Sequence, residues 1–203
     1  MKTLLQVIII YVLLTACSVK ELSPSDYIYW VEDPDNGLHK IEQIGELVYE
    51  VQYKPADYIL CKTGELDEVV SDKLLDSLRT QYDSLIYFTI VLKTTSGKDP
   101  VSQHTNSKDI EEAALYYFQY NFQQDIHLKI ADKDDKQYSP VLFHFERMYT
   151  INNAKVFLMA FDKTSEMKDN DLQLIIHSKY LTSGLVKFYF DKDIFVQQTK
   201  MKL

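Results

Sequence analysis

The sequence predicts an α+β fold: an antiparallel β-rich domain of meander or sandwich-like form with two amphipathic helices. The first observation behind this prediction is that apolar and polar residues alternate along most segments, whereas helical spacing occurs in only two. The second is composition, since the 203 residues are 46% hydrophobic and include 15 Tyr and 10 Phe against 5 Gly and 5 Pro. Such a composition favours strands with packed faces and argues against disorder. We expect one globular domain over 26–203.

The first elements after the N-terminal segment are expected to be strands. Tyr27–Val31 is rich in aromatic and β-branched residues and predicts a strand. Asn36-Gly37 follows and predicts a tight turn, because both residues adopt positive φ readily. Leu38–Ile44 and Leu47–Tyr53 alternate around Gly45 and therefore predict a hairpin.

A helix and a central strand are expected next. The period changes over Asp67–Tyr82, where apolar residues recur every four positions: Val70, Leu74, Leu78 and Tyr82. This spacing predicts an amphipathic helix. Leu85–Lys93 is apolar on both faces, which predicts a central strand covered on both sides.

The second helix and a run of strands complete the chain. A polar loop over 94–106 precedes Asp109 and Glu112, whose spacing is that of a capping box, so a helix is expected from there to Phe122. After a charged turn at 132–136, four strand-like segments follow at short spacing: 141–148, 155–161, 172–177 and 185–190. Short spacing favours an antiparallel meander.

The N-terminal residues 1–16 have the pattern of an export signal. Lys2 supplies a positive start, Leu4–Leu14 an apolar run, and Thr15-Ala16 the small residues that precede a cleavage site. As a helix the apolar run would rise only about 16 Å, against about 30 Å of hydrocarbon, so a permanent transmembrane helix is disfavoured.

Leu14-Thr15-Ala16-Cys17 resembles the lipobox of bacterial lipoproteins. The resemblance implies that Cys17 is the lipid attachment site, carrying a diacylglyceryl group and an acylated amine such as a palmitate amide. Two or more acyl chains anchor a protein durably, so we expect the membrane as a partner through Cys17. Residues 17–25, with Pro24, would form a lipidated tether. An ordinary secretory signal whose cleavage site contains Cys is the alternative.

Several short segments bear on where in the cell envelope the protein is anchored. Ser18 stands where inner-membrane lipoproteins carry Asp, which favours the outer membrane. Residues 18–21 resemble the export tags of Bacteroidota-type surface lipoproteins, and the periplasmic face and the cell surface both stay open. The sequence segments 30–38 and 143–149 are similar to segments of uncharacterised Bacteroidota-type lipoproteins. Those proteins have no assigned activity, so the similarity implies no function.

Charge and cysteine content exclude several classes of function. The net charge is −8 and only Arg79 and Arg147 carry guanidinium groups, so nucleic acid is not expected as a partner. The same charge is repelled by anionic headgroups, leaving the acyl chains as the membrane contact. Once Cys17 is lipidated only Cys61 remains, so no intramolecular disulfide can form, and a buried inert thiol is expected.

Two acidic loops and five histidines are the candidates for metal or catalytic sites. The loops contain Asp132, Asp134 and Asp135, and Asp162, Asp169, Asn170 and Asp171. Joined at one end of a sandwich they would form a cation site, but a solvated turn is the favoured interpretation. His39, His104, His127, His144 and His177 show no metal-binding spacing. His144, Glu146 and His177 would form a small polar site only if their strands were neighbours. We expect no metal and no cofactor.

The first hairpin region gathers aromatic residues that suit either a binding surface or a core: Tyr27, Tyr29, Trp30, Tyr49 and Tyr53. Serine hydrolase and phosphate-binding glycine motifs are absent from the sequence, and the catalytic residues are unknown. The sequence therefore favours a non-catalytic envelope lipoprotein that binds a protein or glycan partner. The alternative is an anchored hydrolase that acts on glycan or peptide through an Asp/Glu pair. A cation-binding adhesin is a weaker third hypothesis.

Overall fold

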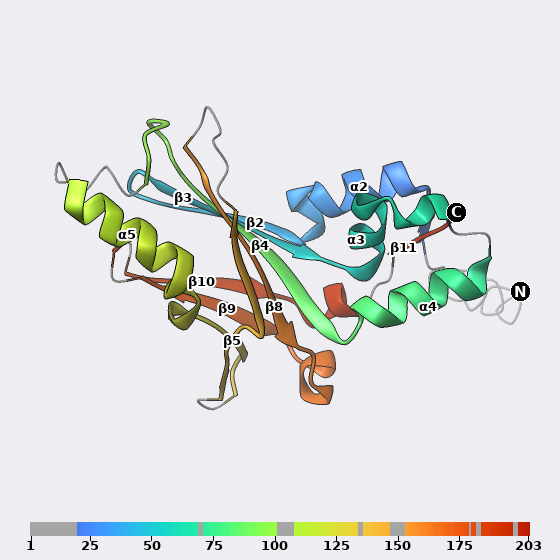
Figure 1. Cartoon of the computed structure of the whole chain (residues 1–203). Coiled ribbons are helices and arrows are strands. Elements are labelled where there is room, and N and C mark those ends of the chain that lie inside the picture. Colours follow the sequence, from blue (N-terminus) through green and yellow to red (C-terminus); the bar gives the residue numbers. More distant parts are fainter. Residues whose placement is uncertain are drawn as a thin grey trace, which may run out of the picture.

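Two antiparallel sheets form the body of the protein in the computed structural model (Figure 1). The structure describes residues 20–68, 71–100, 108–133, 136–146, 153–178, 180–181, 184–196 and 199–203. The signal segment and Cys17 lie outside these residues. The mixed helix and strand content and the antiparallel sheets confirm the predicted α+β class.

The larger sheet has five strands that are all antiparallel to their neighbours. In spatial order they are β2 (His39–Ile44), β3 (Leu47–Lys54), β4 (Leu85–Thr94), β8 (Lys155–Asp162) and β7 (Leu142–Glu146). The predicted hairpin is confirmed, since Ile44 pairs with Leu47 across a turn in which Gly45 has φ 62°. β4 is central, as predicted, but Leu85, Tyr87 and Val91 on its outer face are only half-buried, so cover on both sides was wrong.

The smaller sheet has four strands, and it breaks the predicted meander. Its order is β10 (Leu185–Phe190), β9 (Leu172–His177), β5 (Ile126–Ile130) and β6 (Gln137–Tyr138). β7 and β8 pair in the first sheet, whereas β9 and β10 pair in the second. The chain changes sheets between β8 and β9, so the sandwich-like form holds and the continuous meander was wrong.

Aromatic side chains fill the space between the sheets. Phe88 of β4 lies 5.1 Å from Phe190 of β10, measured between ring centroids. The predicted second helix is present as α5 (Lys108–Tyr120), followed by the 3-10 turn η4 (Phe122–Asp125). Phe118 and Phe122 pack on Phe157 of β8, with centroids 5.8 and 4.7 Å apart. α5 therefore closes one side of the core.

The segment predicted as the first strand is a helix, α2 (Pro24–Glu32). Ser23 caps it by accepting a hydrogen bond from the Asp26 N–H, and Pro24 occupies the first turn, where no intrahelical donor is needed. Tyr27 and Val31 are four residues apart and fully buried, as one helix face requires. The cap and this spacing override the strand propensity of the aromatic residues.

Two further helices complete the set, so the described residues hold four helices rather than the predicted two. α3 (Ala56–Thr63) was not predicted; it ends at Gly64, which has φ 77°, and leads into η2 (Glu65–Glu68). α4 (Asp72–Tyr82) confirms the predicted amphipathic helix, but it begins at Asp72 rather than Asp67 because Ser71 provides the cap. α2, α3 and α4 gather at one end of the body, away from α5 (Figure 1).

The two ends of the described chain meet in a parallel pair of short strands. β1 (Lys20–Leu22) pairs with β11 (Thr199–Met201), and α2 follows β1 directly. The predicted tether over 17–25 was therefore wrong from Lys20 onward, and the folded domain begins before residue 26. The remaining short turns are η1 (Pro34–Asn36), η5 (Ser165–Asp169) and η6 (Lys192–Phe195). Within the described ranges, no helix combines the length and apolar character needed to cross a bilayer.

Candidate functional site

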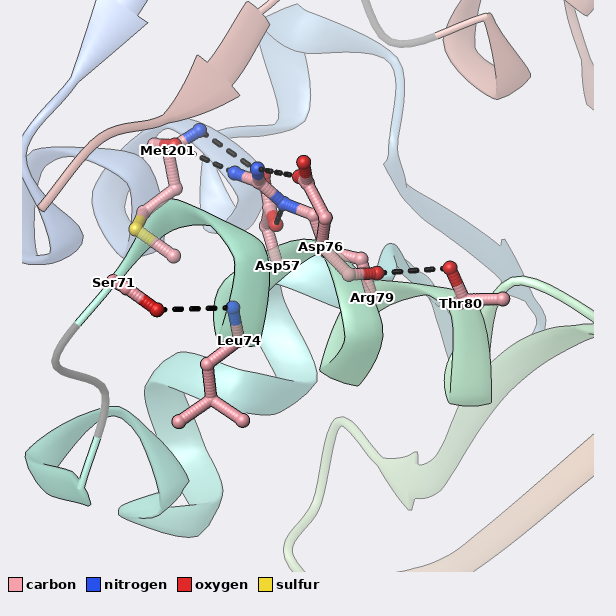
Figure 2. A network of polar contacts seen from close by, with 7 residues as sticks. All are labelled: Asp57, Ser71, Leu74, Asp76, Arg79, Thr80 and Met201. Carbon is pink, nitrogen blue, oxygen red and sulfur yellow. Dashed lines mark hydrogen bonds and ion pairs between the residues drawn. The ribbon is translucent and has the colours of Figure 1, made fainter.

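A buried ion pair joins α3 to α4 (Figure 2). The Asp57 side chain on α3 is 1% exposed, and that of Arg79 on α4 is 26% exposed. Arg79 Nε donates to Asp57 Oδ1 at 2.5 Å, and Nη2 donates to Oδ2 at 3.1 Å. This two-pronged geometry matches the fork of a guanidinium to a carboxylate and satisfies a charge that would otherwise be costly to bury.

The same pair holds the C-terminal strand. The backbone N–H of Met201 donates to Asp57 Oδ2 at 3.1 Å, and Arg79 Nη2 donates to the Met201 carbonyl at 2.8 Å (Figure 2). Asp76 accepts from Arg79 Nη1 at 3.2 Å on the solvent side. Burial by itself lowers the pKa of Arg79, but the bonds to Asp57 and Asp76 outweigh it and raise that pKa. We call Asp57, Arg79 and Met201 the clamp, because they tie α3, α4 and β11 together.

A cleft of about 740 Å³ opens beside the clamp. This volume lies within the roughly 300–1,000 Å³ range of small-molecule sites. Tyr53 and Phe195 form part of its lining, with ring centroids 4.9 Å apart in an edge-on arrangement. α4 contributes Arg79 and Thr80, and the C-terminal segment contributes the exposed Val196. The cleft therefore depends on the position in which the clamp holds α4 and β11.

The cationic side chains of the cleft are not all neutralised. Arg79 is held by Asp57, and Lys163 forms an ion pair with Asp83. Lys168 and Lys200 also line the cleft, and neither has an acidic partner among the residues that the structure describes. In a chain of net charge −8, these two lysines give the cleft a local capacity to hold an anionic group.

Four carboxylates face the same cleft: Asp57, Asp76, Asp83 and Asp169. The predicted alternative, a hydrolase, needs one carboxyl group to donate a proton and a second to act as base or nucleophile. Asp57 and Asp76 are bound by Arg79, and Asp83 by Lys163, so three of the four are engaged in ion pairs. The arrangement suits binding better than carboxylate-pair chemistry.

The structure brings part of the two acidic loops together. Asp132, Asp169, Asn170 and Asp171 line a second hollow of about 430 Å³, joined there by Asp191 and Asp193. The prediction missed those last two residues, while Asp162 lies at the end of β8 and is not part of the lining. Asp134 and Asp135 lie outside the described residues. Across the part of the chain that is described, no group of His, Cys, Asp and Glu has the arrangement of a metal site.

The histidines do not converge on one site. His144 and Glu146 lie on β7 of the larger sheet, but His177 lies on β9 of the smaller sheet, so their strands are not neighbours. His127 is half-buried on β5, and its Nδ1 atom has no hydrogen-bond partner among the residues that are described. His39 Nδ1 lies 3.2 Å from the Glu32 carbonyl. His104 lies outside the described residues. The small polar site suggested by the sequence is not formed.

The aromatic group at the first hairpin is mostly core. Tyr27, Tyr49 and Tyr53 are buried, Trp30 is half-buried against Tyr27, and only Tyr29 is well exposed. These residues therefore do not form an aromatic binding surface. Cys61 is half-buried on α3, and burial followed by the charge of Asp57 raises its pKa to about 11.

Sequence reasoning missed the clamp and the cleft. Its signals were an acid, Asp57, inside the apolar stretch Ala56–Leu60, and Arg79, one of two arginines in the chain. Neither signal shows which residue Asp57 or Arg79 contacts, because residues 57, 79 and 201 are far apart in sequence. No protein-family model, no curated protein and no solved structure was found to match this chain.

Proposed function

We propose that the protein is a non-catalytic lipoprotein of the cell envelope, anchored in the outer membrane through acyl chains on Cys17, that binds an acidic segment of a partner protein in the cleft beside the clamp. The single observation that carries the binding role is a cleft of about 740 Å³ in which Lys168 and Lys200 have no acidic partner among the described residues. The anchoring role rests on the lipobox resemblance of Leu14–Cys17.

The position of β1 supports a binding site close to the membrane. Two residues separate Cys17 from Lys20, and three residue-to-residue steps of an extended chain span at most about 11 Å. Glu21, next to Lys20, is the register partner of Lys200, which lines the cleft. A lipid on Cys17 would therefore hold the cleft near the bilayer surface. A partner that reaches it must also be associated with the envelope.

The lining favours a protein segment over a glycan. Glycan sites commonly offer exposed aromatic faces, but Tyr53 and Phe195 are both buried, at 5% and 8% exposure. Among the described residues, the charged groups of the cleft without an ion pair are the ammonium groups of Lys168 and Lys200 and the carboxylate of Asp169. The two ammonium groups outnumber the one carboxylate, and they can pair with Asp, Glu or a terminal carboxylate.

Photo-crosslinking in cells tests this function. A photoreactive p-benzoylphenylalanine at Val196, which is 64% exposed in the cleft, should give a discrete crosslinked product in the envelope fraction. The matched control replaces Val141, which is 55% exposed and does not line the cleft, and should not give that product.

Charge reversal makes the test specific to the cleft. Lys168→Glu with Lys200→Glu should abolish the Val196 product, whereas Lys187→Glu on the exposed side of β10 should leave it unchanged. Thermal unfolding of each variant checks that the fold is intact. A product that survives the double reversal in a folded protein would contradict the proposal.

A further inference from the structure

A third pocket lies on the opposite side of the larger sheet, and we propose that it binds a short apolar chain that ends in a carboxylate, with Lys54 as the anion partner. Tyr53 and Lys54 are neighbours at the end of β3, so their side chains point to opposite faces of the sheet. Tyr53 faces the cleft and Lys54 faces this pocket, and the two sites share no lining residue. The inference goes beyond the proposed function and does not depend on it.

Strand register builds one side of the pocket. Lys54 is paired with Tyr87, Tyr87 with Ala160, and Ala160 with Leu142. These four residues form one row across β3, β4, β8 and β7 on the outer face of the sheet. Ala160, in the middle of the row, carries only a methyl group between the larger Tyr87 and Leu142.

α3 and neighbouring strand residues provide the remaining walls. Ile59 of α3 and Leu158 of β8 are the aliphatic walls on this face, together with Leu142. Met159 only borders the pocket, because it is in register with Phe88 on the inner face of the sheet. The volume of this open pocket is about 270 Å³. That is just below the roughly 300 Å³ at which drug-sized sites begin, so the pocket suits a fragment such as a single side chain or a short acyl chain.

Lys54 is the charged group of this pocket that lacks an acidic partner among the described residues. It is half-buried, and it forms no ion pair within the described part of the chain. The nearby acid Glu32 is already engaged, since it accepts from Tyr58 at 2.8 Å and pairs with Lys62 at 2.9 Å. Burial lowers the pKa of Lys54, although Glu146 opposes the effect. A ligand carboxylate would supply the missing counter-charge.

The combination of walls and charge selects the ligand chemistry. Aliphatic walls favour an apolar chain because they remove its surface from water. Two ammonium groups, Lys54 and Lys62, belong to the lining. Lys62 is paired with Glu32, so Lys54 is the one left to bind a single anionic terminus. A fatty acid and a peptide with an apolar C-terminal residue both have this chemistry, and the experiment has an arm for each.

Binding is measured with chain from Ser18 to Leu203, which contains every described element. Octanoate is titrated by calorimetry and followed through the methyl signals of Ile59, Leu142 and Leu158. For ten heavy atoms we expect a Kd on the order of 0.1–1 mM. The uncharged match, 1-octanol, should bind about tenfold more weakly or worse, because it lacks the charge-assisted bond. A Gly-Gly-Leu peptide with a free or an amidated C-terminus distinguishes a peptide ligand from an acyl chain.

Variants locate the site. Lys54→Met should weaken octanoate binding by about 10- to 100-fold, whereas Lys54→Arg keeps the charge and most of the affinity. Leu142→Asp places a negative charge in the lining, where it repels the carboxylate of the ligand and should abolish binding. The position is 45% exposed, so the domain should stay folded. Lys187→Met on β10 is the matched control and should bind as the unaltered protein does. The proposal is overturned if neither octanoate nor the free peptide binds at millimolar concentration, or if Lys54→Met and folded Leu142→Asp bind normally.

Discussion

Replacing Arg79 by Met should destabilise the protein more than any other single change at the clamp. The substitution keeps most of the side-chain volume but leaves the Asp57 carboxylate, which is 1% exposed, without a cation. Breaking a buried pair in this way costs about 3–5 kcal/mol, because one charge stays buried and uncompensated. In a domain of this size, 1 kcal/mol corresponds to about 2–4 °C, so Tm should fall by about 6–20 °C.

Two comparison variants separate the buried charge from other causes. Adding Asp57→Asn to Arg79→Met removes the uncompensated charge, while the amide oxygen can still accept from the Met201 N–H, so the double variant should regain about 1–3 kcal/mol. Asp76→Ala removes the other partner of Arg79, but Asp76 is 73% exposed, and such pairs contribute about 0–1 kcal/mol. Urea unfolding followed by circular dichroism measures all three. An Arg79→Met protein within 1 kcal/mol of the unaltered one would refute the clamp.

Three further outcomes are expected. The pKa of Cys61 is raised to about 11, so in a Cys17→Ala protein the thiol should react slowly with Ellman's reagent at pH 8 and about tenfold faster per pH unit above that; fast reaction at pH 8 would show the shift to be absent. Gly37 has φ 78° and room for a methyl group, so Gly37→Ala should cost about 1–2 kcal/mol in urea unfolding from backbone conformation alone, and no loss would contradict this. Burial favours a higher pKa for Glu32, but bonds from Lys62 and Tyr58 lower it below 4.5. Ionised Glu32 therefore stabilises the fold above about pH 4.5, and this effect is lost as the pH falls through the lowered pKa. The free energies of unfolding of the unaltered protein and of Glu32→Gln should therefore become equal in acid. A difference that persisted at pH 2–3 would contradict the lowered pKa.

The strands and helices that were predicted correctly share one property. In each, the spacing of apolar residues and the residue preferences at its ends indicate the same type of element. The hairpin around Gly45 and the helix over Asp72–Tyr82 combine a clear period with a suitable turn or cap. α2 was missed because its aromatic residues favour strands, and its true signal was the cap Ser23-Pro24 followed by buried residues four apart. β1 and β11 are three residues each, too short for any period to appear.

The site was less predictable than the fold, for a physical reason. The clamp joins residues 57, 79 and 201, and the cleft lies among segments from four parts of the chain. A sequence pattern reports local spacing, whereas these contacts depend on how α3, α4 and β11 pack together. The acidic loops show the same limit, because Asp191 and Asp193 joined Asp132 only through the pairing of the smaller sheet.

The most direct test of the account is metabolic labelling with an alkyne analogue of palmitate, followed by fractionation of the envelope. The unaltered protein and a Cys61→Ser variant should both be labelled and sediment with the outer membrane, because Cys17 is intact in each. Cys17→Ala should lose the label and leave the membrane fraction. Label that persists in Cys17→Ala, or an unlabelled native protein, would contradict the central claim that this domain is held at the membrane by lipid on Cys17.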